Sequence, residues 1–137
     1  MKISDFDFRI VRPKNSVGNW CRRGKAECRH NTPFIYGEEA FKKLPQALEK
    51  NAEIELWSGL TDSEGVKIYE GDILKDELGR KWVIKFKEGG FIAHRDAYSK
   101  RGSLTESYTL GMLMCMIVPK VIGNTHENAD LIQGEEE

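Results

Sequence analysis

Apolar and polar residues alternate at the beginning of the chain, where Phe6, Phe8 and Ile10 are separated by charged residues. This period of two predicts a half-buried strand over Asp5 to Val11. The stretch that follows has no period. Its polar and basic part, Trp20 to His30, is typical of a long loop or a variable arm.

The period changes to about 3.6 between residues 37 and 50, which predicts helical structure. Pro45 falls in the middle of this segment, and a proline inside a helix costs about 3 kcal/mol. We therefore expect two short helices that meet near Leu44, with the proline in the first turn of the second helix. Asn51 is expected to end that second helix.

Further along the chain the period returns to two. Alternation around Ile54 and the turn sequence Asp62–Gly65 predict a hairpin from Glu53 to Tyr69. Three antiparallel strands are expected next, joined by short turns that contain glycine. These strands are Asp72–Lys75, Lys81–Lys87 and Phe91–Arg95. We interpret Asp96 to Thr105 as a polar loop.

Apolar residues between positions 110 and 117 show helical spacing, although the β-branched residues at the end also suit a strand; we favour a helix. Residues 121–122 predict a short strand. Asn124 is expected to cap a final helical turn, with Glu127 reaching back to the cap. Together these elements predict an α+β protein with a coiled antiparallel β-sheet, a small barrel-like subdomain and a few short helices.

Composition agrees with this fold class. The 137 residues suffice for one compact domain, or for one domain with an elaborated arm, and the 39% of hydrophobic and 31% of charged residues are typical of a soluble globular protein. Basic residues prevail in the first fifty positions and acidic residues afterwards. No apolar run is long enough for a bilayer and no secretion signal is recognisable, so we expect a cytoplasmic protein with reduced cysteines.

Two segments resemble a known family. Trp57 to Leu74 has the sequence WSGLTDSEGVKIYEGDIL, and Val121 to Asn128 has the sequence VIGNTHEN. In order and separation they are similar to the signature and closing motifs of the YopX family, whose members occur mostly in bacteriophages and prophages. The motif positions are Trp57, Gly59, Leu60, Gly65, Tyr69, Gly71, Asp72, Gly123, Asn124, Glu127 and Asn128. The resemblance covers Glu55 to Ile132, whereas Trp20 to Lys50 departs from the family pattern.

The resemblance implies a phage- or prophage-derived accessory protein in the cytoplasm of a bacterial host, and it brings no established activity with it. It suggests a division into residues 1–52, a YopX-like region over 53–132 and an acidic tail at 133–137. The motif residues themselves favour structural roles. Gly71 permits a sharp change of direction, and Asp72 is suited to accept hydrogen bonds from backbone N–H groups, ligand contact being the alternative.

Candidate metal ligands are few. Cys21, Cys28 and His30 are residue types that bind zinc, but their spacing differs from the C-x(2–4)-C pairing of structural zinc sites. Two thiols in an irregular arm are the alternative, and we predict neither a metal nor a cofactor. Cys115 lies within an apolar segment and is expected in the core.

On a strand, His94 and Asp96 are expected to share one face, which gives at best an acid–base pair for catalysis. An exposed pair that is only hydrogen-bonded is the commoner alternative. His126 and Glu127 are only adjacent in the sequence. No nucleophile elbow, phosphate-binding loop or zinc-protease motif is present. We therefore expect no enzyme, and a hydrolase or metal-dependent enzyme stays as the third hypothesis.

The preferred hypothesis is a non-enzymatic binding or assembly module whose partner is another protein or a second copy. Phe34, Ile35, Tyr36 and the methionine-rich segment at 112–116 are together expected to exceed what one small core can cover, which supports self-association; the alternative is that they belong to the core. The second hypothesis is nucleic-acid binding by the basic arm, against which stands an isoelectric point near 6.3 and neutralisation of the arm by acidic residues within the chain. The residues of this arm are Arg9, Arg12, Lys14, Trp20, Arg22, Arg23, Lys25 and Arg29.

Overall fold

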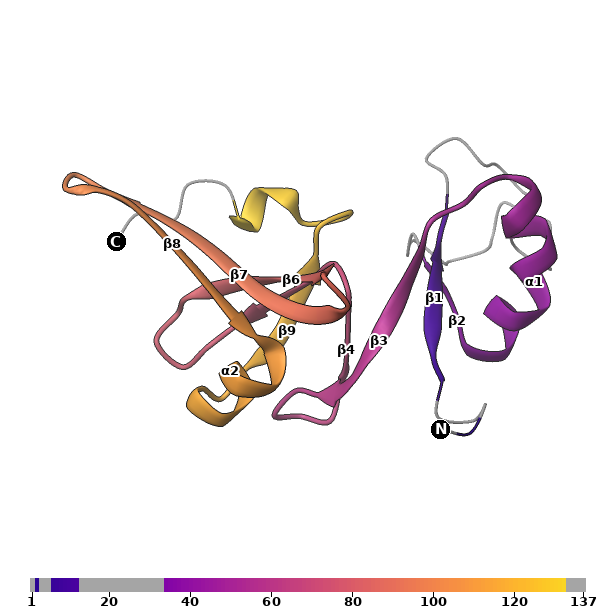
Figure 1. Ribbon diagram of the computed structural model, residues 1–137, viewed down its shortest axis with the longest axis horizontal. Coiled ribbons are helices and arrows are strands. Elements are labelled where there is room, and N and C mark those ends of the chain that lie inside the picture. Colours follow the sequence, from indigo (N-terminus) through magenta and orange to yellow (C-terminus); the bar gives the residue numbers. More distant parts are fainter. Residues whose placement is uncertain (1, 3–5, 13–33, 133–137) are drawn as a thin grey trace. The chain divides into compact units, whose positions relative to one another are not determined.

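The alternating residues near the N-terminus form strand β1 (Phe8–Val11) in the computed structural model, which describes residues 2, 6–12 and 34–132. The chain divides into two compact units, Met1–Trp57 and Ser58–Glu137 (Figure 1). Each unit has its own apolar core, and strand β3 (Ile54–Thr61) begins in the first unit and ends in the second.

In the first unit, β1 pairs antiparallel with β2 (Phe34–Tyr36) and with the beginning of β3. Helix α1 (Gly37–Glu49) packs against this small sheet. The predicted strand is present and Phe8 and Ile10 are buried, but the alternation is not confirmed, because Arg9 between them is buried too and Phe6 is exposed before the strand begins. The core of the unit consists of Phe8, Ile10, Ile35, Ala40 and Ala47.

The prediction of two short helices around Pro45 is wrong, because α1 is one helix with the proline inside it. Pro45 lies on the exposed side of the helix. The carbonyl of Phe41, which loses its helical N–H partner to the proline, is therefore on the side that faces water. Asn51 ends the helix as expected, with a φ of 51° and with the Ala52 N–H donating to the Ala47 carbonyl at 2.9 Å.

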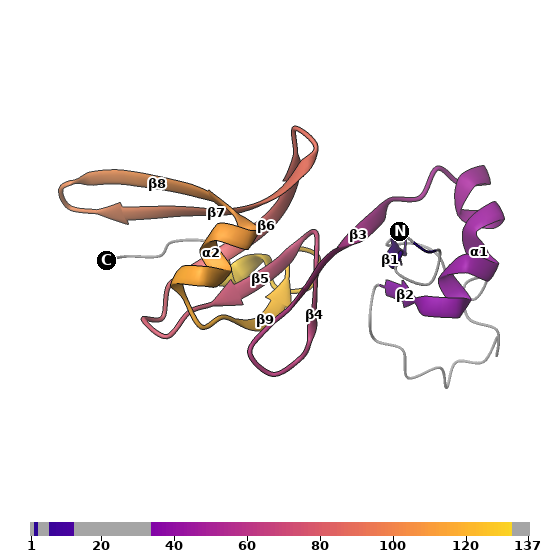
Figure 2. The same ribbon diagram turned by 60° about the horizontal axis from the view of Figure 1, so that its bottom comes forward.

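The second unit is built on a five-stranded antiparallel sheet with the strand order β8-β7-β6-β5-β9. The strands are β5 (Asp72–Lys75), β6 (Lys81–Lys87), β7 (Gly90–Ser99), β8 (Gly102–Thr109) and β9 (Lys120–Asn124). The unit also contains β4 (Lys67–Tyr69), helix α2 (Leu110–Met116) and the short 3-10 helix η2 (Ala129–Ile132). The sheet curls as a half-barrel, which confirms the predicted α+β fold (Figure 2).

The core of the second unit lies between the inner face of this sheet and α2. Trp82 and Ile84 of β6 are buried there, as their alternation with lysines predicts. Helix α2 contributes Leu110 and Leu113, so the helix predicted for this segment is confirmed. The outer face of β6 keeps its lysines in contact with solvent.

Two other predictions for this unit are wrong. Residues 96–105 are not a loop, because β7 continues to Ser99 and β8 begins at Gly102. The covered face of these strands is marked only by the small Ala97 and by Leu104 opposite it, which is too little apolar alternation to predict a half-buried strand. Cys115 is exposed rather than in the core, because α2 packs on the core through Leu110, Leu113 and Met114.

Two turns of the unit share one design, with a buried aspartate and a glycine three residues later. Asp62 Oδ1 accepts from the backbone N–H groups of Glu64 and Val66, and its Oδ2 accepts from Val121 N–H of β9 at 2.9 Å. Gly65 has a φ of 82°, which a glycine adopts without strain. One carboxylate therefore shapes the β3–β4 turn and also fastens it to β9.

Asp76 occupies the same place in the β5–β6 turn. Its Oδ1 accepts from the backbone N–H groups of Leu78 and Arg80 at 2.9 Å each. Its Oδ2 accepts from Arg80 Nε at 2.7 Å and from the indole N–H of Trp82 at 3.1 Å. The carboxylate thus connects a surface turn to the largest side chain of the core.

Candidate functional site

The outer face of β7 and β8 carries a chain of four hydrogen-bonding side chains. His94 Nδ1 lies 2.9 Å from Ser107 Oγ on the neighbouring strand, and His94 Nε2 lies 3.1 Å from Asp96 Oδ2. The other carboxylate oxygen of Asp96 accepts from the Thr105 hydroxyl at 2.9 Å. Because a carboxylate only accepts, Nε2 carries a proton, and Ser107 donates to Nδ1 when the imidazole is neutral.

The network keeps Asp96 ionised. The hydrogen bonds from the Thr105 hydroxyl and then from the His94 ring hold the pKa of the Asp96 carboxyl below its usual value, against a smaller opposing effect of desolvation. The positive charge of Lys85 adds to the lowering. The outer face therefore carries one fixed negative charge that is already hydrogen-bonded on both oxygens.

A shallow cleft of about 190 Å³ lies beside this network, between the outer face of the sheet and the segment that follows β9. The sheet contributes Lys81 and Lys85 of β6 and His94 and Asp96 of β7. The opposite wall is formed by Thr125 and Ile132, and the rest of the lining by Val83 and Arg95. Its volume is below the 300 Å³ or so of a typical small-molecule pocket.

The pair His94 and Asp96 shares one strand face, as the sequence predicts. Ser107 completes a serine–histidine–aspartate trio that the sequence analysis missed, because the register of β8 on β7 brings it opposite His94. Ser107 does not line the cleft, however, and it sits in the middle of a strand rather than on a sharp turn. The geometry is that of a cross-strand connection between β7 and β8.

A second surface feature lies at the end of the unit where α2 and two turns meet. Glu77 of the β5–β6 turn accepts a hydrogen bond from the Val118 N–H at 2.8 Å, and Ser63 of the β3–β4 turn donates to the Pro119 carbonyl at 3.0 Å. Large apolar side chains from these segments are between 47% and 73% exposed. They are Val66, Leu78, Met112, Met116 and Val118, and we call this set the apolar end.

Comparison with known proteins identifies the family. A family model described as YopX protein matches residues 18–133. The chain belongs to the YopX family. No curated protein matches it. The match includes the basic segment from residue 18 onward, which the sequence resemblance placed outside the family pattern.

The first YopX segment shapes the backbone around β4 and β5. Asp72 Oδ2 accepts from the Tyr69 N–H at 2.8 Å, which is the contact expected of a residue that fixes a turn. Gly71 has a φ of 85°, and its N–H donates to the Ile84 carbonyl of β6 at 2.7 Å. Gly59 likewise has a positive φ, of 84°, within β3.

The closing YopX segment folds over one glycine. A Cβ at Gly123 would lie 2.7 Å from the side-chain Cγ of Asn128, so only glycine leaves room for that amide. Asn124 Oδ1 accepts from the backbone N–H groups of His126 and Glu127 at 3.0 and 2.9 Å. Asn128, rather than the predicted Glu127, reaches back to the cap, where its Oδ1 accepts from the Asn124 N–H.

The basic arm of the YopX chain is described only at its start. Arg9 is buried, with Nε donating to Glu55 at 2.9 Å and with its guanidinium 3.8 Å from the centre of the Phe34 ring, so it is not placed to contact phosphates. Arg12 is half-buried. The remaining arm residues lie outside the described residues: Lys14, Trp20, Arg22, Arg23, Lys25 and Arg29.

Cys21, Cys28 and His30 also lie outside the described residues, so the structure tests neither these candidate zinc ligands nor the prediction that no metal binds there. Over residues 2, 6–12 and 34–132, no three histidine, cysteine, aspartate or glutamate side chains gather closely enough to bind a metal ion. In the same part of the chain, neither helix has the length and apolar character needed to cross a membrane.

Proposed function

We propose that this YopX-family chain is a non-enzymatic accessory protein of phage or prophage origin, acting in the cytoplasm of a bacterial host, that assembles with a second copy of itself. The observation that carries the proposal is the apolar end. Apolar side chains scattered singly on a surface need no explanation. Here five exposed ones come from segments that the Glu77–Val118 and Ser63–Pro119 hydrogen bonds hold together, and apolar side chains gathered in this way are typical of an interaction site. Methionine is also enriched in protein–protein interfaces.

The border of the apolar end favours a second copy as the partner. Lys120 and Glu64 form an exposed ion pair at 3.1 Å next to Val66, so charges of both signs stand beside the apolar side chains. A twofold interface places the same patch against itself, and a border with both signs is then self-complementary. A partner whose surface carries charges of only one sign would fit such a border less well.

A second set of exposed apolar side chains lies on the first unit: Phe6, Phe41, Leu44 and Leu48. The chain between residues 13 and 33 belongs to the same unit and is not described. In the second unit every residue from 58 to 132 is described, and only residues 133–137 are not. We therefore place the interface on the second unit.

The position of Ser107 supports a role without catalysis. A hydrolytic serine needs a bound substrate within reach of its hydroxyl and of the donors that stabilise the oxyanion. Ser107 instead donates its hydroxyl across the strands and stands outside the cleft. Its hydrogen bond then serves to hold β8 on β7.

Sedimentation velocity tests the proposal with two matched double variants. Met112→Gln/Met116→Gln removes two apolar side chains four residues apart on α2, and Leu44→Gln/Leu48→Gln makes the same change on α1. We expect the unmodified chain and the Leu44/Leu48 variant to shift from monomer to dimer as concentration rises, while the Met112/Met116 variant stays monomeric. Dimers that persist in the Met112/Met116 variant, or that disappear only in the Leu44/Leu48 variant, contradict it.

A further inference from the structure

The β7–β8 hairpin continues beyond the body of the second unit as a two-stranded ribbon. Pairing of β7 with β6 ends at Val83 and His94, whereas pairing of β7 with β8 continues from Arg95 and Glu106 to Ser99 and Gly102. Five residue pairs therefore have no third strand, a length of about 17 Å at roughly 3.4 Å per residue. Figures 1 and 2 both show this ribbon projecting from the sheet.

The ribbon is braced at its base by side chains of both faces. On one face Arg95 donates to Glu106 at 2.9 Å, and on the other Asp96 accepts from Thr105 and lies 3.1 Å from His94. An isolated hairpin is marginally stable in water, and these cross-strand contacts give the ribbon a defined register. They also engage both carboxylates of the ribbon.

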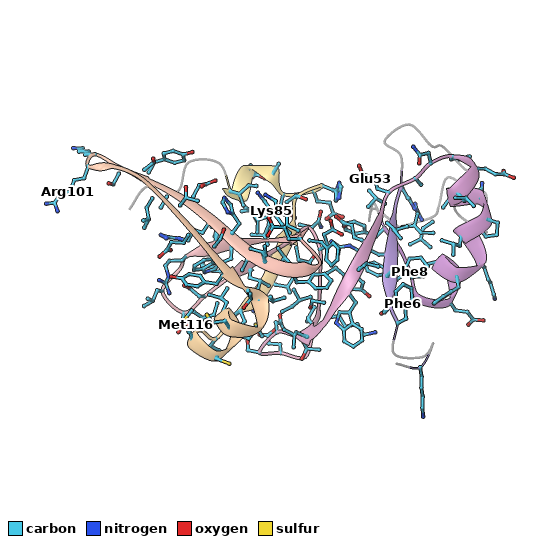
Figure 3. All side chains as sticks on the ribbon, viewed as in Figure 1. Phe6, Phe8, Glu53, Lys85, Arg101 and Met116 are labelled. Atoms are coloured by element: carbon cyan, nitrogen blue, oxygen red, sulfur yellow. The ribbon has the colours of Figure 1, made fainter. Side chains whose placement is uncertain are left out.

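The tip of the ribbon is positively charged. Lys100 and Arg101 form its turn and are exposed, and in the part of the chain that the structure describes neither has a carboxylate partner. Figure 3 shows Arg101 at the far end of the hairpin, pointing away from the unit. Tyr98, 55% exposed, and Ser103 lie opposite each other just below the tip. A cationic turn is thus followed by side chains that donate and accept hydrogen bonds.

We propose that this ribbon is a DNA-binding arm that enters a groove of duplex DNA. The major groove of B-DNA is about 12 Å wide and admits a two-stranded β-ribbon. Lys100 and Arg101 then neutralise phosphates, while Tyr98 and Ser103 face the groove. The lysines of β6, of which Lys85 is labelled in Figure 3, lie on the same outer face and extend the positive surface towards the body of the unit.

Duplex DNA fits this surface better than a protein partner does. Glu106 is paired with Arg95. The negative charge of Asp96 lies at the base of the ribbon near Lys85, whereas the two charges of the tip are both positive. Phosphates supply the complementary charge to the tip at regular spacing. Double-stranded RNA is a poorer fit, because its major groove is too deep and narrow for a ribbon. The proposal does not rest on the apolar end, which belongs to other segments of the unit.

Fluorescence anisotropy with a labelled 20-base-pair DNA duplex tests the proposal over a series of salt concentrations. Three double variants remove two positive charges each: Lys100→Gln/Arg101→Gln at the ribbon tip, Arg22→Gln/Arg23→Gln in the basic arm, and Lys42→Gln/Lys43→Gln on α1. We expect the tip variant to bind about tenfold or more weakly at low salt, and to reduce the slope of log K against log salt by about 2, as the loss of two phosphate contacts requires. The α1 variant should bind as the unmodified chain does.

Three outcomes overturn the proposal. The unmodified chain does not bind the duplex at low salt, the tip variant binds unchanged, or the arm variant alone loses binding, which moves the interface to the arm. A duplex RNA of the same sequence serves as the second readout. Weaker binding to RNA is expected, and equal binding excludes insertion into a groove. The tip residues are exposed, so thermal unfolding of the tip variant should match that of the unmodified chain.

Discussion

Aspartates play different roles in the turns of the second unit and on its outer surface. Asp62 and Asp76 point inward and hold backbone N–H groups, whereas Asp96 sits on an exposed ribbon and bonds only to neighbouring side chains. The segments by which the YopX family is recognised belong to the first kind. The turns of the family signature therefore mainly hold the fold together, and of the two surfaces that we propose for partners only Val66 of the apolar end lies within a signature segment.

Removal of the Asp76 carboxylate should have the largest effect on stability. Asp76→Ala leaves the Trp82 indole N–H and two backbone N–H groups without their acceptor, and we expect the free energy of unfolding to fall by about 3 kcal/mol. Denaturant unfolding measures this loss. Glu64→Ala is the control at an exposed position of the other turn, and it should change stability by no more than about 0.5 kcal/mol. If Asp76→Ala and Glu64→Ala lowered the free energy of unfolding equally, the buried turn carboxylate would be no more important for stability than an exposed one.

Gly123→Ala tests the closing motif through its contact with Asn128. The added methyl group would meet the Asn128 side chain, and we expect a loss of about 1–3 kcal/mol. Asn128→Gly removes the obstacle, so the double variant should be less destabilised than the sum of the two single variants. Additive losses in this double-mutant cycle would show that the clash is not the cause.

Low pH should destabilise the protein through the two turn aspartates. Burial alone would raise the pKa of both Asp62 and Asp76, but hydrogen bonds from the N–H groups around each carboxylate outweigh it and leave both pKa values below the usual one. Carboxyls with a lowered pKa in the folded state stabilise it above their unfolded pKa, near 3.9, and lose that contribution as the pH falls through the folded values. The free energy of unfolding should therefore fall with pH below about 5, and less steeply in Asp76→Asn.

Breaking the network on the ribbon should have the smallest effect on global stability. Thr105→Ala removes one exposed hydrogen bond to Asp96, and we expect less than about 1 kcal/mol of destabilisation. Amide hydrogen exchange should nevertheless accelerate in β7 and β8 beyond His94, because local opening of the ribbon does not require unfolding of the core. Unchanged exchange rates there would mean that this network does not brace the ribbon.

Much of the second unit follows from the sequence, because its strands are half-buried. The bounds predicted for β5 and β6 match the structure, and the alternation of Trp82 and Ile84 with lysines indicates the buried face. The ribbon was missed because the covered face of β7 at its base carries only Arg95 and the small Ala97, which leaves almost no apolar period. The shared face of His94 and Asp96 follows from strand geometry alone, but Ser107 joins them only through the register of β8.

The apolar end was only partly foreseen. Met112 and Met116 were grouped by sequence with Phe34, Ile35 and Tyr36, and of these three Phe34 and Ile35 are buried in the first unit. Leu78 and Val66 join the two methionines through turns far away in the sequence. Only the tertiary structure, in which both turns bond to residues 118–119, brings the set together.

The most direct test of the proposed assembly measures the oxidation of individual methionines by hydrogen peroxide at low and high protein concentration. The apolar end predicts that Met112 and Met116, which are exposed in the single chain, become protected as dimers form, while the half-buried Met114 on the same helix changes little. Oxidation rates of Met112 and Met116 that are the same at every concentration, in a sample shown to contain dimers, would contradict the account.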